Sequence, residues 1–171
     1  MTAYITAQLI GFLGYLFLIT APNFSNKKQI IKIELVACAL LCTQWILLGY
    51  STLIILNILN ISVTLITLYF KRNADRIISI FYPLGCLALL AVSTGAILDA
   101  LCIIAFFGFT RAKISQDMFG FRAFSMMAGF TFMICGICAL SVPAAIFNGI
   151  FALGHLKSVL NSSEKSALKT Q

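Results

Sequence analysis

Amide side chains recur inside the long apolar stretches of this chain, where a polar group is costly unless it meets a partner or water. Asn57 and Asn60 are three residues apart and so share one helical face, and Asn148 stands at a matching depth in a later stretch. An amide can both donate to and accept from hydroxyl or amide groups of a solute. With Gln44 and with Trp45, a stacking surface for a ring, these residues predict the substrate-binding lining of a central path.

Asp99 is the acidic residue that we expect well within an apolar stretch. Intramembrane carboxylates often carry protons in transporters, so Asp99 is a candidate for a coupling proton. The alternative is an interfacial carboxylate at a helix N-terminus, where the helix dipole favours it. The amides have an alternative too, as interhelical hydrogen-bonding groups worth about 0.6 kcal/mol each. Glu34, close to Lys32, is expected to form a solvated ion pair near the surface.

Residues for enzymatic or metal chemistry are scarce. The chain has one histidine, His155, and shows no Ser/His/Asp set, no cluster with metal-ligand spacing and no phosphate-binding Gly loop. Cys135 and Cys138 have a CxxC spacing without a second such pair, and thiols in apolar helices pack as small hydrophobes. We therefore expect no enzyme activity, no cofactor and no bound metal.

The composition is that of a membrane protein. The chain is 61% hydrophobic and 10% charged, whereas a soluble domain carries about 25% charged residues. The net charge of +7 is spread over short segments that would face anionic lipid, so it requires no nucleic-acid partner. The expected partners are the lipid bilayer and a small polar solute, and the chain is expected to be a monomer or a homodimer.

The twelve lysines and arginines fall in four clusters at alternate ends of the apolar runs. Positive charge stays in the cytoplasm during insertion, and one crossing takes about 20 helical residues. The sequence therefore predicts seven spans, with the N-terminus outside and the C-terminus cytoplasmic. The spans are expected at residues 4–21, 30–48, 53–70, 77–92, 97–110, 121–139 and 144–156.

Two groups of three spans repeat the same features. In each group, a helix returning from the cytoplasm is followed by a short uncharged turn and a helix that carries Asn57 or Asn148. An intervening helix lets both groups insert in the same orientation, as parallel repeats do in SWEET-type transporters. We expect an all-α membrane protein of 3+1+3 architecture. Its parts are expected at residues 1–72 (first repeat), 73–95 (linker helix), 96–160 (second repeat) and 161–171 (flexible cytoplasmic tail).

Several short motifs resemble a known family. They are Met1-Thr2-Ala3-Tyr4, Ala7-Gln8 with Gly11, Lys27-Lys28-Gln29, and Leu47-Leu48-Gly49 leading to Asn57. In combination they resemble the YgjV-type bacterial inner-membrane proteins, which are grouped with the SWEET, SemiSWEET and PQ-loop (MtN3-like) proteins. The resemblance implies a multi-pass protein of the bacterial inner membrane. It also implies that Asn57 and Asn148 face the solute, as an Asn in the third helix of each SWEET triplet does.

The chain departs from that pattern in three places. Lys28-Gln29 stands where PQ-loop proteins carry Pro-Gln. Gln44 replaces a histidine expected near the end of the second span, and Cys135 stands at its counterpart in the second repeat. These departures weaken the transfer of a proton-linked role from the family.

Three hypotheses for the function follow. The first is a transporter or facilitator of a sugar-like or other polar metabolite, with its site between the two triplets. The second is a PnuC-like carrier of a vitamin precursor, although that type is usually rich in Trp and this chain has one. The third is a membrane scaffold or regulator that transports nothing, in which the Asn residues are buried without a cavity.

Overall fold

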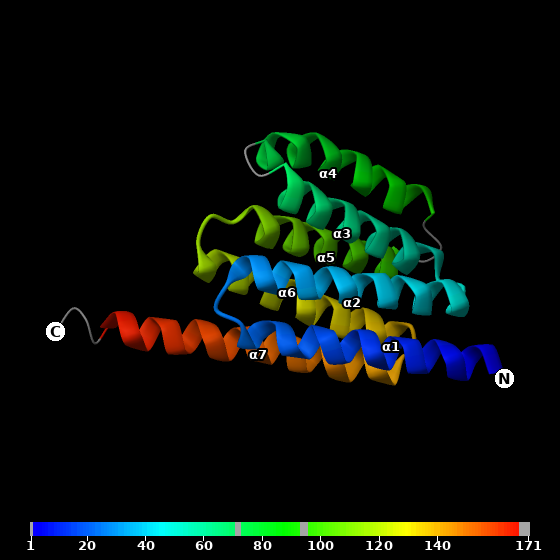
Figure 1. Ribbon diagram of the computed structural model, residues 1–171. Coiled ribbons are helices and arrows are strands. Elements are labelled where there is room, and N and C mark those ends of the chain that lie inside the picture. Colours follow the sequence, from blue (N-terminus) through cyan, green and yellow to red (C-terminus); the bar gives the residue numbers. More distant parts are fainter. Residues whose placement is uncertain (1, 71–72, 93–95, 168–171) are drawn as a thin grey trace.

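The computed structural model describes residues 2–70, 73–92 and 96–167, and within them the chain is helical throughout, with no strand (Figure 1). The elements are α1 (Thr2–Thr20), the 3-10 helix η1 (Ala21–Asn23), α2 (Lys27–Leu48), α3 (Ser51–Tyr69), α4 (Ala74–Ala91), α5 (Ala96–Ile114), α6 (Met118–Cys138) and α7 (Val142–Ala167).

A helix stands at each of the seven predicted spans. Each begins up to three residues before its predicted span, because the apolar run omits the polar first turn. Among the described residues, six helices are long and apolar enough to cross a membrane. The seventh, α5, carries Asp99 in its first turn and Arg111 and Lys113 in its last, so its charges lie at both of its ends.

Polar caps start two of the helices. The Asn26 side chain accepts a hydrogen bond of 2.9 Å from the Lys28 N–H at the start of α2. The Asp117 carboxylate accepts one from the Gly120 N–H at the start of α6. Both caps satisfy backbone donors that have no partner within the helix.

The turns between α2 and α3 and between α6 and α7 have the same backbone form. Gly49 has φ of 76° and Leu140 has φ of 51°, both in the left-handed region. In each turn the next residue's N–H bonds back to a carbonyl five residues earlier, at 3.2 Å from Tyr50 and 2.8 Å from Ser141. Glycine takes this conformation freely, whereas a leucine takes it under strain.

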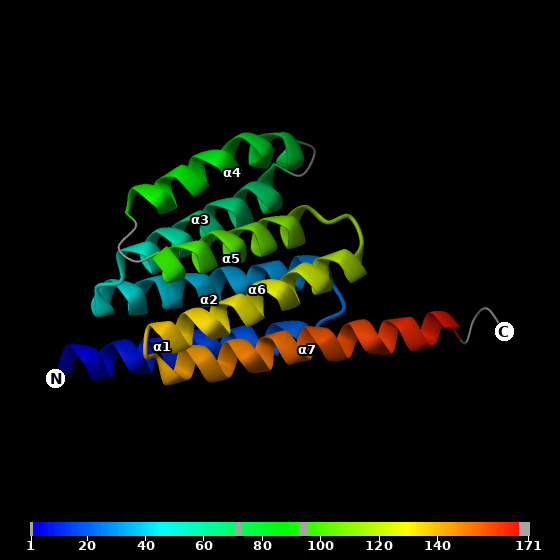
Figure 2. The same cartoon turned by 180° about the vertical axis from the view of Figure 1, so that it is seen from behind.

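Six helices form a closed ring. The neighbours around it are α1, α2, α3, α5, α6 and α7, and α7 packs against α1 to close it (Figures 1 and 2). Successive helices run in opposite directions, so α1–α3 and α5–α7 are two triplets with the same orientation. Outside the ring, α4 packs on α3 and α5, where Gly85 lets the Phe106 ring approach.

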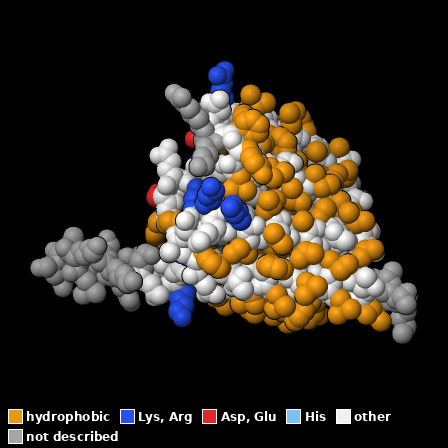
Figure 3. Space-filling model, in the orientation of Figure 1, with side chains coloured by type: hydrophobic (Ala, Val, Ile, Leu, Met, Phe, Trp, Pro, Cys, Tyr) orange, Lys and Arg blue, Asp and Glu red, His pale blue; other side chains and the backbone are white. Residues whose placement is uncertain are grey.

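The outer surface of the ring is apolar. Leu9 on α1 and Leu87 on α4 are each 62% exposed, and large hydrophobic side chains cover the face seen in Figure 3. Only 22% of the residues of α4 are buried within the protein. Exposed apolar area of this extent is typical of a surface that faces lipid.

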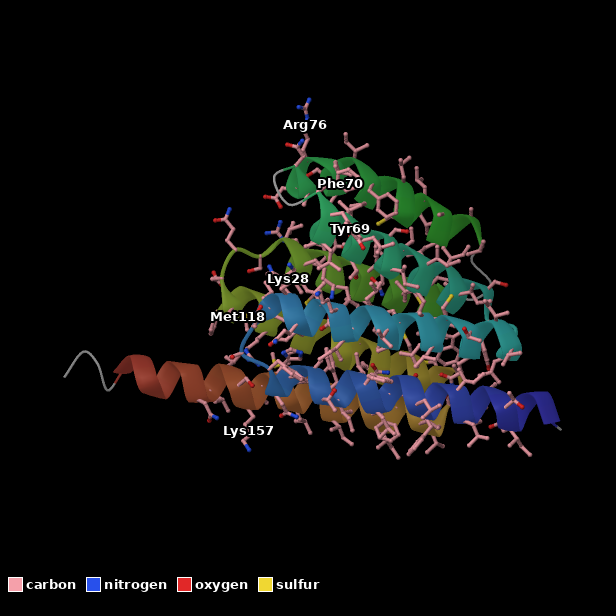
Figure 4. All side chains as sticks on the ribbon, in the orientation of Figure 1. Lys28, Tyr69, Phe70, Arg76, Met118 and Lys157 are labelled. Atoms are coloured by element: carbon pink, nitrogen blue, oxygen red, sulfur yellow. The ribbon has the colours of Figure 1, made fainter. Side chains whose placement is uncertain are left out.

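The described lysines and arginines gather at one end of the ring, which we call the basic end. Lys28, Arg76 and Lys157 lie there in Figure 4, at the starts of α2 and α4 and in the last part of α7. The chain begins at the opposite end, with α1, and α7 runs past the basic end (Figure 1). Helix α1 therefore begins, and helix α7 ends, on opposite sides of the ring.

The tail expected at residues 161–171 lies within the described part of the chain only as far as residue 167. Helix α7 continues through residue 161 to Ala167 as a regular helix. The sequence from 161 to 167 has no Gly or Pro to end a helix, although its polar residues end the apolar pattern on which the prediction depended. Residues 168–171 lie outside the described part of the chain.

Candidate functional site

A small cavity lies in the middle of the ring. Its volume is about 20 Å³, enough for a single water molecule. Every helix of the ring contributes to its lining, which consists of Tyr15, Leu18, Cys38, Leu41, Trp45, Asn57, Asn60, Phe109, Phe132 and Asn148. The two triplets therefore meet at this cavity.

Asn57 and Asn148 line the cavity from α3 and α7. They are 3% and 4% exposed. The Nδ2 of Asn57 donates to the Leu53 carbonyl oxygen at 2.8 Å, and that of Asn148 donates to the Ala144 carbonyl oxygen at 2.8 Å. The nitrogen of each amide is thus anchored in the same way, to the backbone of its own helix four residues earlier.

Tyr15 is a cavity residue that was not among the predicted site residues. It is 1% exposed and lines the cavity together with Asn148. Its ring stacks on Phe147 with 5.7 Å between centroids. The nearby glycines could have indicated this position in the sequence. Gly14 allows α1 to pack closely against Leu41 of α2, and the next residue, Tyr15, is then buried.

Asn60 and Trp45 also line the cavity, as predicted from the sequence. The Oδ1 of Asn60 is buried and has no hydrogen-bond partner among the described residues. Trp45 is 3% exposed and meets the Tyr50 ring edge-on, at 5.7 Å between centroids. A buried acceptor without a partner beside a water-sized space indicates that the cavity accommodates a polar group.

Gln44 does not reach the cavity. It is fully buried and faces Gly11 of α1, where an added Cβ would overlap its amide. Its Oε1 and Nε2 have no hydrogen-bond partner among the described residues. Adjacent residues point about 100° apart around a helix, so that when Trp45 turns inward Gln44 turns toward α1.

Asp99 lies outside the cavity lining, toward the end of the ring opposite the basic end. It is 3% exposed and accepts a hydrogen bond of 3.1 Å from the Thr52 hydroxyl. At the same end the Tyr50 hydroxyl donates to the Ala139 carbonyl oxygen at 3.1 Å. Each of these hydrogen bonds joins one triplet to the other.

Glu34 corrects the expectation of a solvated pair with Lys32. It is 1% exposed and forms an ion pair with Lys113, which is 3% exposed. The pair joins α2 to α5 and lies in the half of the ring nearer the basic end. The expectation was wrong because it considered only residues close to Glu34 in sequence, whereas its partner Lys113 comes from another helix.

Two further cationic side chains join the triplets at the basic end. Lys27 donates to the Ser115 carbonyl oxygen, between α5 and α6. Arg122 on α6 donates to the carbonyl oxygens of Pro22 at 3.1 Å and Phe24 at 3.0 Å. With the Glu34 ion pair, these bonds connect the two triplets at the basic end.

No described group of three or more His, Cys, Asp or Glu side chains is placed to hold a metal ion. Cys135 is buried and Cys138 is exposed, so the two thiols of the CxxC motif occupy different surroundings. His155 is fully buried between the rings of Phe121 and Phe151, at 6.0 Å and 4.5 Å between centroids.

Comparison with known proteins places the chain in a family. No curated protein and no solved structure matches it. A family model named Imp-YgjV and described as a bacterial inner membrane protein matches residues 5–164, which is nearly all of the chain. The match agrees with the resemblance of the motifs and with the apolar outer surface. The protein therefore belongs to the Imp-YgjV family of multi-pass bacterial inner membrane proteins.

Proposed function

We propose that this protein is a carrier or facilitator of a small polar solute, with its binding site at the central cavity between the two triplets. The observation that carries the proposal is the meeting of Asn57 and Asn148, from corresponding helices, at one enclosed space. The unpartnered oxygen of Asn60 adds an acceptor there. Amides beside aromatic rings suit a sugar-like or other hydroxyl-bearing metabolite.

An internal repeat supports the proposal. Asn57 and Asn148 are 91 residues apart, and the same spacing relates Gly49 to Leu140 and the helix caps Asn26 and Asp117. It also relates two further pairs of cavity residues, which are Leu18 with Phe109 and Leu41 with Phe132. A constant spacing over three helices favours the 3+1+3, SWEET-like architecture, with 1–72 and 96–160 as repeats and α4 within the linker 73–95.

Alternating access follows from this arrangement. The cavity has room for about one water molecule, so a metabolite enters only when the triplets separate at one end. The Glu34–Lys113 pair and its two neighbouring contacts close the basic end, and the Thr52–Asp99 and Tyr50–Ala139 bonds close the other. We propose that the basic end faces the cytoplasm. Asp99 stays a candidate for a coupling proton, because its protonation would change the bond to Thr52.

A scaffold or regulator is the second candidate, and the size of the cavity favours it. In that function the two amides would only hold helices together, each bonded to its own backbone. No conformational opening would then be needed, and no solute would bind.

A binding screen separates the two candidates. The purified protein is heated with sugars, organic acids, nucleosides and vitamin precursors, and a ligand at 100 times its Kd stabilises it by about 2.7 kcal/mol. Asn57→Ala and Asn148→Ala should abolish the shift in melting temperature, whereas Asn161→Ala, on the exposed part of α7, should keep it. The absence of any hit, followed by no uptake of the same solutes into proteoliposomes, would favour the scaffold.

A further inference from the structure

A second and larger hollow opens at the basic end. It is a cleft of about 550 Å³ between the first turns of α2 and α4, the last turns of α3 and α5, and the segment after α5. This volume is within the range of sites for small ligands. We call it the basic cleft. It is separate from the central cavity, since the two share no lining residue.

Three amines and one carboxylate line the basic cleft. Lys27 and Lys28 stand at the start of α2, Lys113 stands near the end of α5, and Asp75 stands in the first turn of α4. Lys113 is 3% exposed and held by the Glu34 ion pair. Its ammonium group is therefore held by Glu34 and lies near the Phe109 ring, and neither of these residues lines the cleft.

The other two amines differ in how firmly they are held. Lys27 is tied to the Ser115 carbonyl oxygen, and its Nζ lies 5.5 Å from the centre of the Phe121 ring. The Lys28 side chain is exposed and makes no hydrogen bond or ion pair with the described residues (Figure 4). The Lys28 amine is thus free to move toward a ligand, whereas the Lys27 amine is already held at the cleft.

The uncharged lining also suits an anion with a polar head. The positive end of the α2 dipole opens on the cleft, which favours negative charge there. Polar side chains of Asn26, Thr67 and Gln116 add hydrogen-bonding groups, and Ile31 and Leu68 supply an apolar side.

We propose that the basic cleft binds a phosphate-bearing anion, held by Lys27 and Lys28. Phosphate accepts several charge-assisted hydrogen bonds, and lysine is a common partner for it. The phosphate comes either from an anionic phospholipid headgroup, with its chains along the apolar side, or from a soluble phosphorylated metabolite. The inference does not rest on the proposed transport function, because the central site is elsewhere.

The soluble source is tested with inorganic pyrophosphate. The full chain in nanodiscs of phosphatidylcholine is titrated by calorimetry. We expect Lys28→Gln to weaken binding about tenfold, since a bond to a charged group contributes about 1.5–3 kcal/mol. Asp75→Asn, which removes the opposing charge, should tighten binding several-fold. Lys157→Gln removes an exposed lysine on α7, away from the cleft, and should leave the affinity unchanged.

The lipid source is tested with the same variants in nanodiscs with and without phosphatidylglycerol. If a headgroup is the ligand, phosphatidylglycerol raises the melting temperature of the wild type and of Lys157→Gln, but much less that of Lys28→Gln. Pyrophosphate then binds weakly or not at all. Loss of both responses in the wild type would overturn the proposal. Equal effects of the Lys28 and Lys157 substitutions would also overturn it, because they would show only an attraction to overall charge.

Discussion

Lys113 and Glu34 form an ion pair that is almost completely removed from solvent, between α5 of one triplet and α2 of the other. Two buried charges stabilise a structure only weakly as a pair, because desolvation offsets much of their attraction. A single charge left without its partner is far more costly. Removing only one of the two side chains at this contact between the triplets is therefore strongly destabilising.

The first prediction concerns this pair. Lys113→Met leaves the Glu34 carboxylate buried and uncompensated, and we expect it to lower the free energy of unfolding by about 3–5 kcal/mol. The measurement is an unfolding titration of the purified protein in mixed micelles. The double variant Glu34→Leu with Lys113→Met should recover most of the loss, since no charge then remains. A double variant as unstable as the single one would contradict this prediction.

The second prediction compares the two left-handed turns. Leu140→Gly relieves a backbone strain of about 1–2 kcal/mol, partly offset by the greater freedom of glycine in the unfolded chain. We expect a gain of about 1 kcal/mol in the same titration. Gly49→Ala should show the reverse, because no atom lies within 4 Å of the added Cβ and only the strain is introduced. The prediction would be contradicted if both variants raised, or both lowered, the free energy of unfolding.

The third prediction concerns the close crossing of α6 and α7. A Cβ added at Gly136 would lie 2.6 Å from the Ala145 nitrogen and 2.8 Å from the Ala144 carbonyl carbon, both of them backbone atoms. Gly136→Ala should therefore destabilise the protein by about 1–3 kcal/mol. Gly149→Ala is the matched control, because its nearest neighbour is the flexible Met133 side chain at 3.2 Å. The control should be close to neutral, and melting temperatures in detergent would compare the two.

The fourth prediction concerns α5, which is not among the six described helices that are long and apolar enough to cross the membrane. If it does cross, alkaline phosphatase fused after Val92 is active outside the cytoplasm, and green fluorescent protein fused after Gln116 fluoresces inside it. A fluorescent C-terminal fusion is expected as well. Reporters after Val92 and Gln116 that indicate the same side would show that α5 does not cross, and would refute the proposed orientation of the second triplet.

Much of the fold could be predicted from the pattern of apolar runs. The number of helices and their places follow from the length needed to cross a bilayer and from the clustering of charge. The predicted ends of the helices were less accurate, because Lys27 and Ser51 begin their helices outside the apolar runs. A hydropathy pattern detects the lipid-facing part of a helix but not the polar turns beyond it.

The candidate site was only partly predictable. Asn57, Asn148, Asn60 and Trp45 line one cavity, as the helical spacing indicated. Gln44 turns to α1 instead, because the direction of a side chain around its helix depends on how that helix is rotated against its neighbours. The same rotation brings Glu34 to Lys113, a residue far away in the sequence. Such contacts depend on helix packing, which hydropathy and spacing do not encode.

The closure of the ring by α1 and α7 has a consequence for synthesis in the cell. Helix α1 leaves the ribosome before α7, so its side toward α7 is covered only when α7 arrives, and Tyr15 meets Phe147 and Asn148 only at that stage. Until then the membrane holds an open arc with polar side chains along its inner edge. Chains that stop before α7 would keep that edge exposed, so that membrane proteases have a feature by which to distinguish unfinished molecules from complete ones.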